Sequence, residues 1–102
     1  MNKIIENKIS ELKDICFSLD VKKLYIFGSV NSVNFRDDSD IDFLLSFEDN
    51  LSIERYTNNY FDLQYKLREL FNRDIDIVTE RTLSNPYFIK SIDESKKLIY
   101  EN

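Results

Sequence analysis

LYIFGSVNSVNFRDDSDIDFLLS, residues 24–46, contains two apolar runs that are separated by a polar loop. The first run ends at Gly28 and Ser29, and the second run follows Asp40 and Asp42. This order predicts a strand, a turn and a second strand, with chemically active side chains where the strands meet. Gly28 is the only glycine of the chain, and a glycine after a strand lets the backbone approach a ligand, most often a phosphate.

Acidic side chains near this turn are candidates for a cation site. Asp40 and Asp42 are two residues apart in an extended segment, so both side chains leave one face, about 7 Å apart along the strand. Two carboxylates on one face repel each other unless a cation lies between them; the alternative is a solvated turn before a strand. Asp74 and Asp76 lie on one face of a later β-branched segment. Of these two acids we favour Asp76 as a site residue, because it lies further inside that strand.

Strand directions follow from where these residues must meet. The turn after the first strand and the acids that open the second strand share one site only if the two strands run antiparallel. The second and third strands are separated by a helix of about 20 residues, which suits a parallel crossover. The sequence therefore predicts an α/β fold with a small mixed β-sheet and flanking α-helices.

Apolar periodicity and turn residues define the other elements. Apolar residues at alternating three- and four-residue steps predict two long helices, the second with Asp49 or Asn50 as its N-cap. Pro86 suits the first turn of a later helix that Ser84 or Asn85 would cap. In chain order we expect a helix over residues 2–19, a strand over Leu24–Phe27, a short helix over Ser29–Asn34, a strand over Ile41–Phe47, a helix over Leu51–Phe71, a strand over Asn72–Thr79, a helix from Pro86 to about Lys96, and an edge strand over Leu98–Tyr100.

Some conspicuous side chains of the helices are predicted to be core residues without a chemical role. Cys16 lies on the apolar stripe of the first helix, where a cysteine packs as a small hydrophobic residue. Helical spacing of aromatic residues is typical of core packing rather than of a ladder that stacks nucleobases. The aromatic residues of the second long helix that we assign to the core are Tyr56, Tyr60, Phe61 and Tyr65.

Composition restricts the function further. The 102 residues, 42% of them hydrophobic, predict one domain over residues 1–102. No apolar run reaches membrane length and no signal-peptide centre lies near the start, so we expect a cytoplasmic protein without membrane contact. One cysteine and no histidine exclude an internal disulfide and the usual zinc site, so oxygen atoms would bind any metal.

The charge of the chain is also informative. A net charge of −5, with scattered basic residues, argues against direct binding of nucleic acid. An acidic protein that handles a polyanionic substrate needs divalent cations to bridge the two, and Mg²⁺ suits this because a few carboxylates and substrate phosphates can hold it.

The spacing of these residues resembles a known signature. Gly28 and Ser29, followed after ten residues by Asp40 and Asp42 alternating with apolar residues, are similar to the signature of the nucleotidyltransferase superfamily that includes DNA polymerase β. The short chain resembles the minimal version, the MNT domain, which is often paired with HEPN-domain proteins in toxin–antitoxin systems. The resemblance covers nearly the whole chain and places Asp76 where the family keeps its third carboxylate.

The resemblance implies a reaction. Asp40, Asp42 and Asp76 would hold two Mg²⁺ ions, or Mn²⁺ in their place. Gly28 and Ser29 would bind the β and γ phosphates of a nucleoside triphosphate, with ATP expected. A hydroxyl would attack the α-phosphorus, pyrophosphate would leave, and Asp76 would help to activate the hydroxyl.

The resemblance also implies a partner. The expected acceptor is a tyrosine hydroxyl of a HEPN-type ribonuclease toxin, which this chain would neutralise as an antitoxin. A small-molecule transferase would need a second, helical domain to hold its acceptor, which we do not expect in 102 residues. The oligomeric state stays open.

Two features favour other interpretations. After the Gly-Ser pair, family members commonly carry an arginine and a second glycine, whereas this chain has Val30, Asn31, Ser32 and Val33. The alternative function is therefore a catalytically weak or inactive MNT domain that neutralises its partner by binding alone. Asp37 and Asp38 resemble the acidic pocket of phosphoacceptor domains, but the sequence lacks the later strands ending in Asp and Lys that such domains need.

Overall fold

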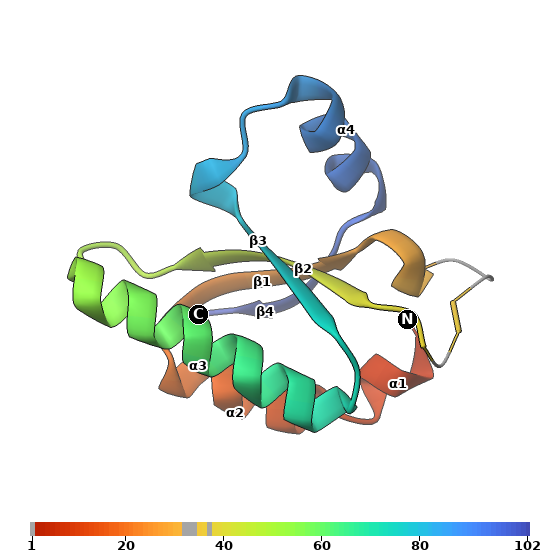
Figure 1. Cartoon of the computed structure of the whole chain (residues 1–102), viewed down its shortest axis with the longest axis horizontal. Helices are drawn as coiled ribbons and strands as arrows, with labels where there is room; N and C mark the ends of the chain where they lie inside the picture. The colour runs from red at the N-terminus through yellow and green to blue at the C-terminus, as the bar shows by residue number, and fades with distance from the viewer. Residues whose placement is uncertain (1, 32–34, 37) are drawn as a thin grey trace.

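A four-stranded β-sheet with the strand order β3-β2-β1-β4 forms the centre of the molecule (Figure 1). The computed structural model describes residues 2–31, 35, 36 and 38–102. Its strands are Val21–Phe27 (β1), Ile41–Phe47 (β2), Ile75–Thr79 (β3) and Lys97–Glu101 (β4). β1 runs antiparallel to β2 and β4, and β2 runs parallel to β3. The mixed sheet and the edge position of the last strand are thus confirmed.

The helices lie on both sides of the sheet. Figure 1 shows α2 (Ile9–Ser18) and α3 (Ile53–Phe71) on one side, with the single turn α1 (Lys3–Glu6) beside them, and α4 (Pro86–Ser95) on the other side. Two short 3₁₀ helices, η1 (Gly28–Asn31) and η2 (Glu80–Thr82), follow β1 and β3. None of the helices in the described part of the chain is long and apolar enough to span a bilayer.

The two faces of the sheet bury unequal cores. On the face that α2 and α3 cover, alternate residues of β2 (Ile41, Phe43 and Leu45) join a large cluster that includes Leu24, Leu63 and Leu67. The opposite face carries Asp42 and Leu44, and α4 covers it through a small cluster formed by Phe27, Leu44 and Ile92. The period of two in β2 therefore directs apolar residues to the main core and leaves Asp42 on the less covered face.

The first predicted helix is divided in the structure. Its residues form α1 and α2, because Lys8 has a non-helical backbone (φ −117°, ψ 9°) between them. The following strand is longer than predicted, since its pairing with β2 already begins at Val21. Cys16 is buried in the main core, as expected, and this burial raises the pKa of its thiol to about 12.

Local capping corrects the bounds of the second long helix. Asp49 and Asn50 are not its N-cap, because Asn50 has a left-handed backbone (φ 69°) and Ser52 accepts the N–H of Arg55 at 3.1 Å instead. At the other end Asn72 is left-handed (φ 51°, ψ 45°) and ends α3, so residues 72–74 form a turn and β3 is shorter than predicted.

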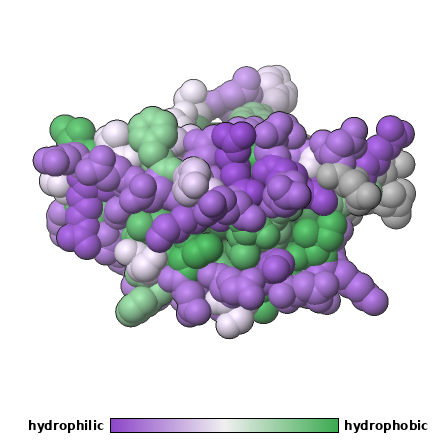
Figure 2. Space-filling view, turned by 60° about the horizontal axis from the view of Figure 1, so that its bottom comes forward, coloured by the Kyte–Doolittle hydropathy of each residue, from purple (hydrophilic) through white to green (hydrophobic). Residues whose placement is uncertain are grey.

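The prediction that all four aromatic residues of α3 belong to the core is partly wrong. Tyr56 and Tyr60 pack against the main core, but Phe61 and Tyr65 are 62% and 63% exposed. They lie on the outer side of α3, away from its buried residues Leu63, Leu67 and Phe71. Figure 2 turns the helical side toward the viewer and shows apolar side chains among predominantly hydrophilic ones.

The remaining helix predictions have different outcomes. Asn85 caps α4 by accepting the N–H groups of Tyr87 and Phe88, which confirms one of the two predicted caps. The short helix predicted over residues 29–34 is observed as η1 up to Asn31, and residues 32–34 lie outside the described residues. Asp37, one of the two acids of the phosphoacceptor alternative, also lies outside them.

Candidate active site

The centre of the candidate site is the contact between Gly28 and Asp42. Phe27, the last residue of β1, is paired with Asp42 of β2, so Gly28 turns away beside the Asp42 side chain. Gly28 has a positive φ of 75°, and a Cβ atom placed on it would lie 2.5 Å from Oδ2 of Asp42. Glycine is favoured at this position, because another residue would be strained at this φ and its Cβ would displace the Asp42 carboxylate oxygen.

Asp76 reaches the same place from the third strand. The parallel register pairs Asp42 with Asp76, which puts the two residues side by side on neighbouring strands. The hydroxyl of Ser29 contacts the carbonyl oxygen of Asp40 at 3.4 Å and so links the turn after β1 to the entry of β2. Gly28, Ser29, Asp40, Asp42 and Asp76, the predicted site residues, therefore lie together at one end of the sheet.

Asp74 is placed differently from Asp76. It lies before β3, and its exposed carboxylate forms an ion pair with Arg68 at 3.5 Å. Its carbonyl oxygen accepts the N–H of Ile41 at 3.2 Å, which makes it part of the connection between β3 and the start of β2. Of these two acids, only Asp76 is paired directly with Asp42.

The electrostatics of the site centre on Asp42. Burial, with the negative charges of Asp76 and Asp40 as further causes, raises the pKa of Asp42 to about 6. Asp40 and Asp76 are exposed, whereas Asp42 is half-buried. At neutral pH the folded protein thus holds negative charges close together, and a bound cation would relieve this repulsion.

The donor set suits a hard divalent cation. The acids of the site offer only carboxylate oxygens, the ligands that Mg²⁺ prefers. Within residues 2–31, 35–36 and 38–102, no three acidic or thiol side chains are gathered closely enough to hold a metal ion in their present positions. The carboxylate oxygens suit Mg²⁺ chemically, and a cation would relieve the repulsion between them. The side chains would have to converge to bind the ion.

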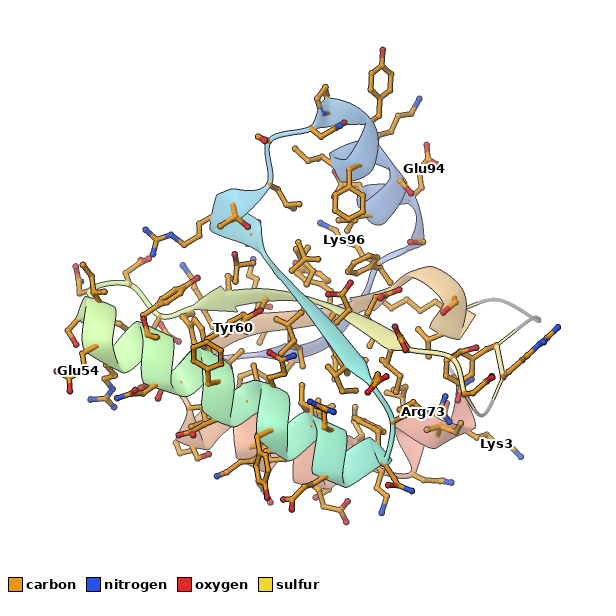
Figure 3. The ribbon with its side chains drawn as sticks, viewed as in Figure 1. Lys3, Glu54, Tyr60, Arg73, Glu94 and Lys96 are labelled. Atoms are coloured by element: carbon orange, nitrogen blue, oxygen red, sulfur yellow. The ribbon has the colours of Figure 1, made fainter. Side chains whose placement is uncertain are left out.

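Two contacts of the site were not predicted from the sequence. The N–H of Gly28 points to the hydroxyl of Ser95 in α4 at 3.5 Å, and Arg73 contacts the segment that precedes β2. Figure 3 shows Arg73 at the start of β3 beside that segment. Periodicity and motif spacing carry no signal for such contacts, because the paired residues are 34–67 positions apart.

Comparison with known proteins defines the class to which this fold and site belong. Residues 8–102 match the family model described as polymerase beta, nucleotidyltransferase. A protein of Methanocaldococcus jannaschii, provisionally named a protein adenylyltransferase, is 31% identical over 100 residues, which cover 98% of this chain and 93% of the relative. A second relative of the same organism and name is 34% identical over 80 residues, which cover 78% and 76% of the two chains. The chain belongs to the polymerase β-like nucleotidyltransferase family, which confirms the predicted enzyme class.

Solved structures confirm the fold. A provisionally described minimal nucleotidyltransferase is similar with a TM-score of 0.75 and 24% identity, covering 93% of this chain and 92% of the other. A toxin–antitoxin crystal structure with AMP-PNP has a TM-score of 0.66 and 25% identity, with coverages of 95% and 73%. The complex of a tri-AMPylated Shewanella oneidensis HEPN toxin with its MNT antitoxin gives 0.62 and 24%, with coverages of 100% and 74%. The structural neighbours are thus minimal nucleotidyltransferases and MNT–HEPN pairs.

Proposed function

We propose that this protein transfers AMP from ATP onto a hydroxyl of a partner protein, in a reaction that depends on Mg²⁺ or Mn²⁺. One observation carries the proposal: the strand register that brings Gly28, Asp42 and Asp76 together at one end of the sheet. The names of the relatives, protein adenylyltransferases, support AMP as the group and a protein as the acceptor. We also propose that residues 1–102 act as a single domain in the cytoplasm, where ATP is available.

Each site residue has a role in this proposal. Asp40, Asp42 and Asp76 would hold two Mg²⁺ ions, which neutralise phosphate charge and polarise the phosphorus–oxygen bonds when bound. The backbone N–H groups of Gly28 and Ser29, together with the Ser29 hydroxyl, would bind the β and γ phosphates. The N–H of Gly28 is suited to this role because its present contact, with Ser95 at 3.5 Å, is long and readily exchanged for a phosphate oxygen.

The reaction is an in-line displacement at the α-phosphorus. The acceptor oxygen forms a bond to that phosphorus while the bond to pyrophosphate breaks, and the carboxylate of Asp76 takes the hydroxyl proton. The exposed position of Asp76 supports this role, since an acceptor can approach it from solvent. Asp42, half-buried beside Gly28, is less accessible and suits cation binding better.

The proposed acceptor is a tyrosine hydroxyl of a HEPN-type toxin, and the protein would act as its antitoxin. The similarity to a complex of an AMPylated HEPN toxin with an MNT antitoxin supports this partner. A chain of net charge −5 would also attract a basic, RNA-binding partner through long-range electrostatics. High salt should therefore slow the association of the two proteins.

Labelled ATP tests the proposed reaction. The protein is incubated with a candidate HEPN-type partner and with Mg²⁺, using α-labelled ATP in one sample and γ-labelled ATP in another. We expect the partner to retain label only from the α position, and Asp42→Asn to abolish the transfer. Label from the γ position would instead identify a kinase.

A second function, neutralisation by binding alone, has one observation in its favour. Val30, which follows the Gly-Ser pair, is 2% exposed and packs in the main core, so this position supplies no cation for a triphosphate. A tight complex without transfer of either label would support this function. Equal inhibition of the partner's ribonuclease activity by wild-type protein and by Asp42→Asn would establish it.

A further inference from the structure

We propose that Arg73 is a positioning residue that fixes the backbone on which Asp40 is presented to the candidate site. This inference rests on the proposed function, because that function has Asp40 bind Mg²⁺. Arg73 lies in the turn between α3 and β3, and its side chain reaches back to the segment that leads into β2 (Figure 3).

Arg73 binds both ends of a turn that immediately precedes Asp40. Its Nη1 donates to the carbonyl oxygen of Arg36 at 3.0 Å and to that of Ser39 at 3.1 Å. The turn is closed by its own hydrogen bonds, since the N–H of Ser39 donates to the Arg36 carbonyl at 3.1 Å and the N–H of Arg36 donates to the Ser39 hydroxyl at 3.0 Å. One guanidinium nitrogen thus ties a closed turn to the start of β3.

Asp40 is fixed on both sides by consecutive residues of one segment. The carbonyl of Ser39, before Asp40, accepts from Arg73, and the N–H of Ile41, after Asp40, donates to the carbonyl of Asp74 at 3.2 Å. The segment that contains Arg73 and Asp74 reaches Asp76 two residues later, and Asp76 is paired with Asp42. Arg73 and Asp74 therefore set the position of Asp40 relative to Asp76, although neither side chain belongs to the proposed ligand set.

The surroundings of the guanidinium favour an arginine at this position. Its Cζ lies 4.7 Å from the centre of the Phe35 ring, so the planar group stacks on an aromatic face while it donates to the two carbonyls. Its Nε is buried and has no hydrogen-bond partner among the described residues. An unsatisfied buried donor is unfavourable, so the stacking and the two carbonyl bonds must outweigh it. A lysine can keep the charge and its ammonium group can donate to carbonyls, but it lacks the planar group that lies over the Phe35 ring.

The test compares Arg73→Met and Arg73→Lys with Arg81→Met as the matched control. Arg81 also stacks on an aromatic ring, 5.0 Å from the centre of Tyr56, but it lies beyond the opposite end of β3. Mn²⁺ alone is the probe, titrated into each protein and followed by electron paramagnetic resonance. Supporting contacts behind metal ligands commonly change affinity 10- to 100-fold, so we expect about tenfold weaker Mn²⁺ binding for Arg73→Met. Arg73→Lys should lose less affinity, and Arg81→Met none.

Hydrogen exchange supplies a readout that does not depend on metal or activity. The amides of Ser39 and Ile41 should exchange faster in Arg73→Met than in wild type, and at the wild-type rate in Arg81→Met. Unchanged exchange at both amides overturns the proposal. If the wild type binds Mn²⁺, an unchanged Mn²⁺ affinity in Arg73→Met also overturns it. If Arg73→Met does not fold, the same two measurements on Arg73→Lys decide.

The two proposals fail in different ways. If the wild type transfers no AMP, the proposed function fails, while exchange at Ser39 and Ile41 still shows whether Arg73 holds the segment before Asp40. If the wild type transfers AMP, and Arg73→Met has the same transfer rate and the same dependence on Mg²⁺ concentration, only the positioning role fails.

Discussion

Gly28 and Asp42 illustrate how closely a backbone turn and a carboxylate can constrain each other. The glycine has a left-handed backbone, and its missing side chain leaves the space that the Asp42 oxygen fills. The same closeness helps to bury Asp42, and burial is the main reason that the pKa of this carboxyl is raised. One pair of residues thus sets both the shape of the proposed phosphate-binding turn and the charge of the proposed metal site.

Gly28→Ala should destabilise the protein by about 1–2 kcal/mol, because alanine is strained at positive φ and its Cβ would collide with Asp42. Urea unfolding measures the loss. Asp42→Ala in the same chain removes the collision but keeps the backbone strain, so the double variant should recover part of the stability. A double variant as unstable as the sum of both single changes would contradict the collision.

The pH dependence of stability tests the charge on Asp42 in metal-free protein. Its folded-state pKa of about 6 exceeds the ordinary aspartate pKa of 3.8, so the folded protein binds this proton more tightly than the unfolded chain. The stabilisation from that proton is fully present below pH 3.8 and is lost as pH rises through about 6. Asp42→Asn removes this loss.

We therefore expect Asp42→Asn to be more stable than wild type at pH 7 with EDTA, by about 1 kcal/mol because solvent screens the partly open site. The difference should shrink toward pH 4. Urea unfolding at a series of pH values measures it, and Ser29→Ala serves as a control at the same site without a titrating group. A difference that is independent of pH would show that the substitution acts through packing.

Strand β3 shows how an element at the edge of a sheet is protected. The Asp74 carbonyl bonds toward β2, so the alternation of a parallel strand turns the carbonyls of Ile77 and Thr79 to the outer edge. Ile77 contacts the Tyr60 hydroxyl at 3.4 Å there, and Thr79 accepts from the Thr82 hydroxyl at 2.9 Å. Side-chain hydroxyls thus occupy acceptors that could otherwise pair with another chain.

Tyr60→Phe combined with Thr82→Val should expose this edge and increase self-association, because both outward carbonyls lose their donors. Light scattering and size-exclusion chromatography across a concentration series measure the effect. Tyr65→Phe is the control, since its hydroxyl contacts Glu69 on the outer side of α3. Equal association in the control would assign the effect to surface hydrophobicity.

The elements also show what the sequence could predict. Strand β2 and the parallel crossover through α3 follow from period-two and helical patterns, and the acids alternating with apolar residues in β2 and β3 follow from the same periods. The ends of the helices were harder to predict from the sequence. Asn50 has a left-handed backbone, and Ser52 is the N-cap of α3 instead. The Arg73 and Ser95 contacts depend on the packing of distant elements, which no local pattern encodes.

At the scale of the whole molecule, ligand binding should stabilise the fold. A ligand that binds only the folded state at 100 times its Kd adds about 2.7 kcal/mol, which for a domain of this size raises Tm by roughly 10–20 °C. We expect such a shift with Mg²⁺ and a non-hydrolysable ATP analogue together, and a smaller one with either alone. Differential scanning fluorimetry measures it.

Asp42→Asn is the control for this stabilisation, since it should abolish the nucleotide-dependent shift while the protein still unfolds cooperatively. If the wild type shows no shift at millimolar analogue and Mg²⁺, the protein does not use a nucleotide, and neutralisation by binding alone becomes the better description.

The strand order has a consequence for synthesis on the ribosome. β1 is made early and lies inside the finished sheet, but one of its neighbours, β4, is made last, with Ile26 opposite Lys97. About 70 residues separate these partners, so at ~5–20 residues per second one edge of β1 stays unpaired for about 4–14 s. An apolar strand with an open edge is a target for aggregation, so the nascent chain should depend on chaperones during that interval more than its small size suggests.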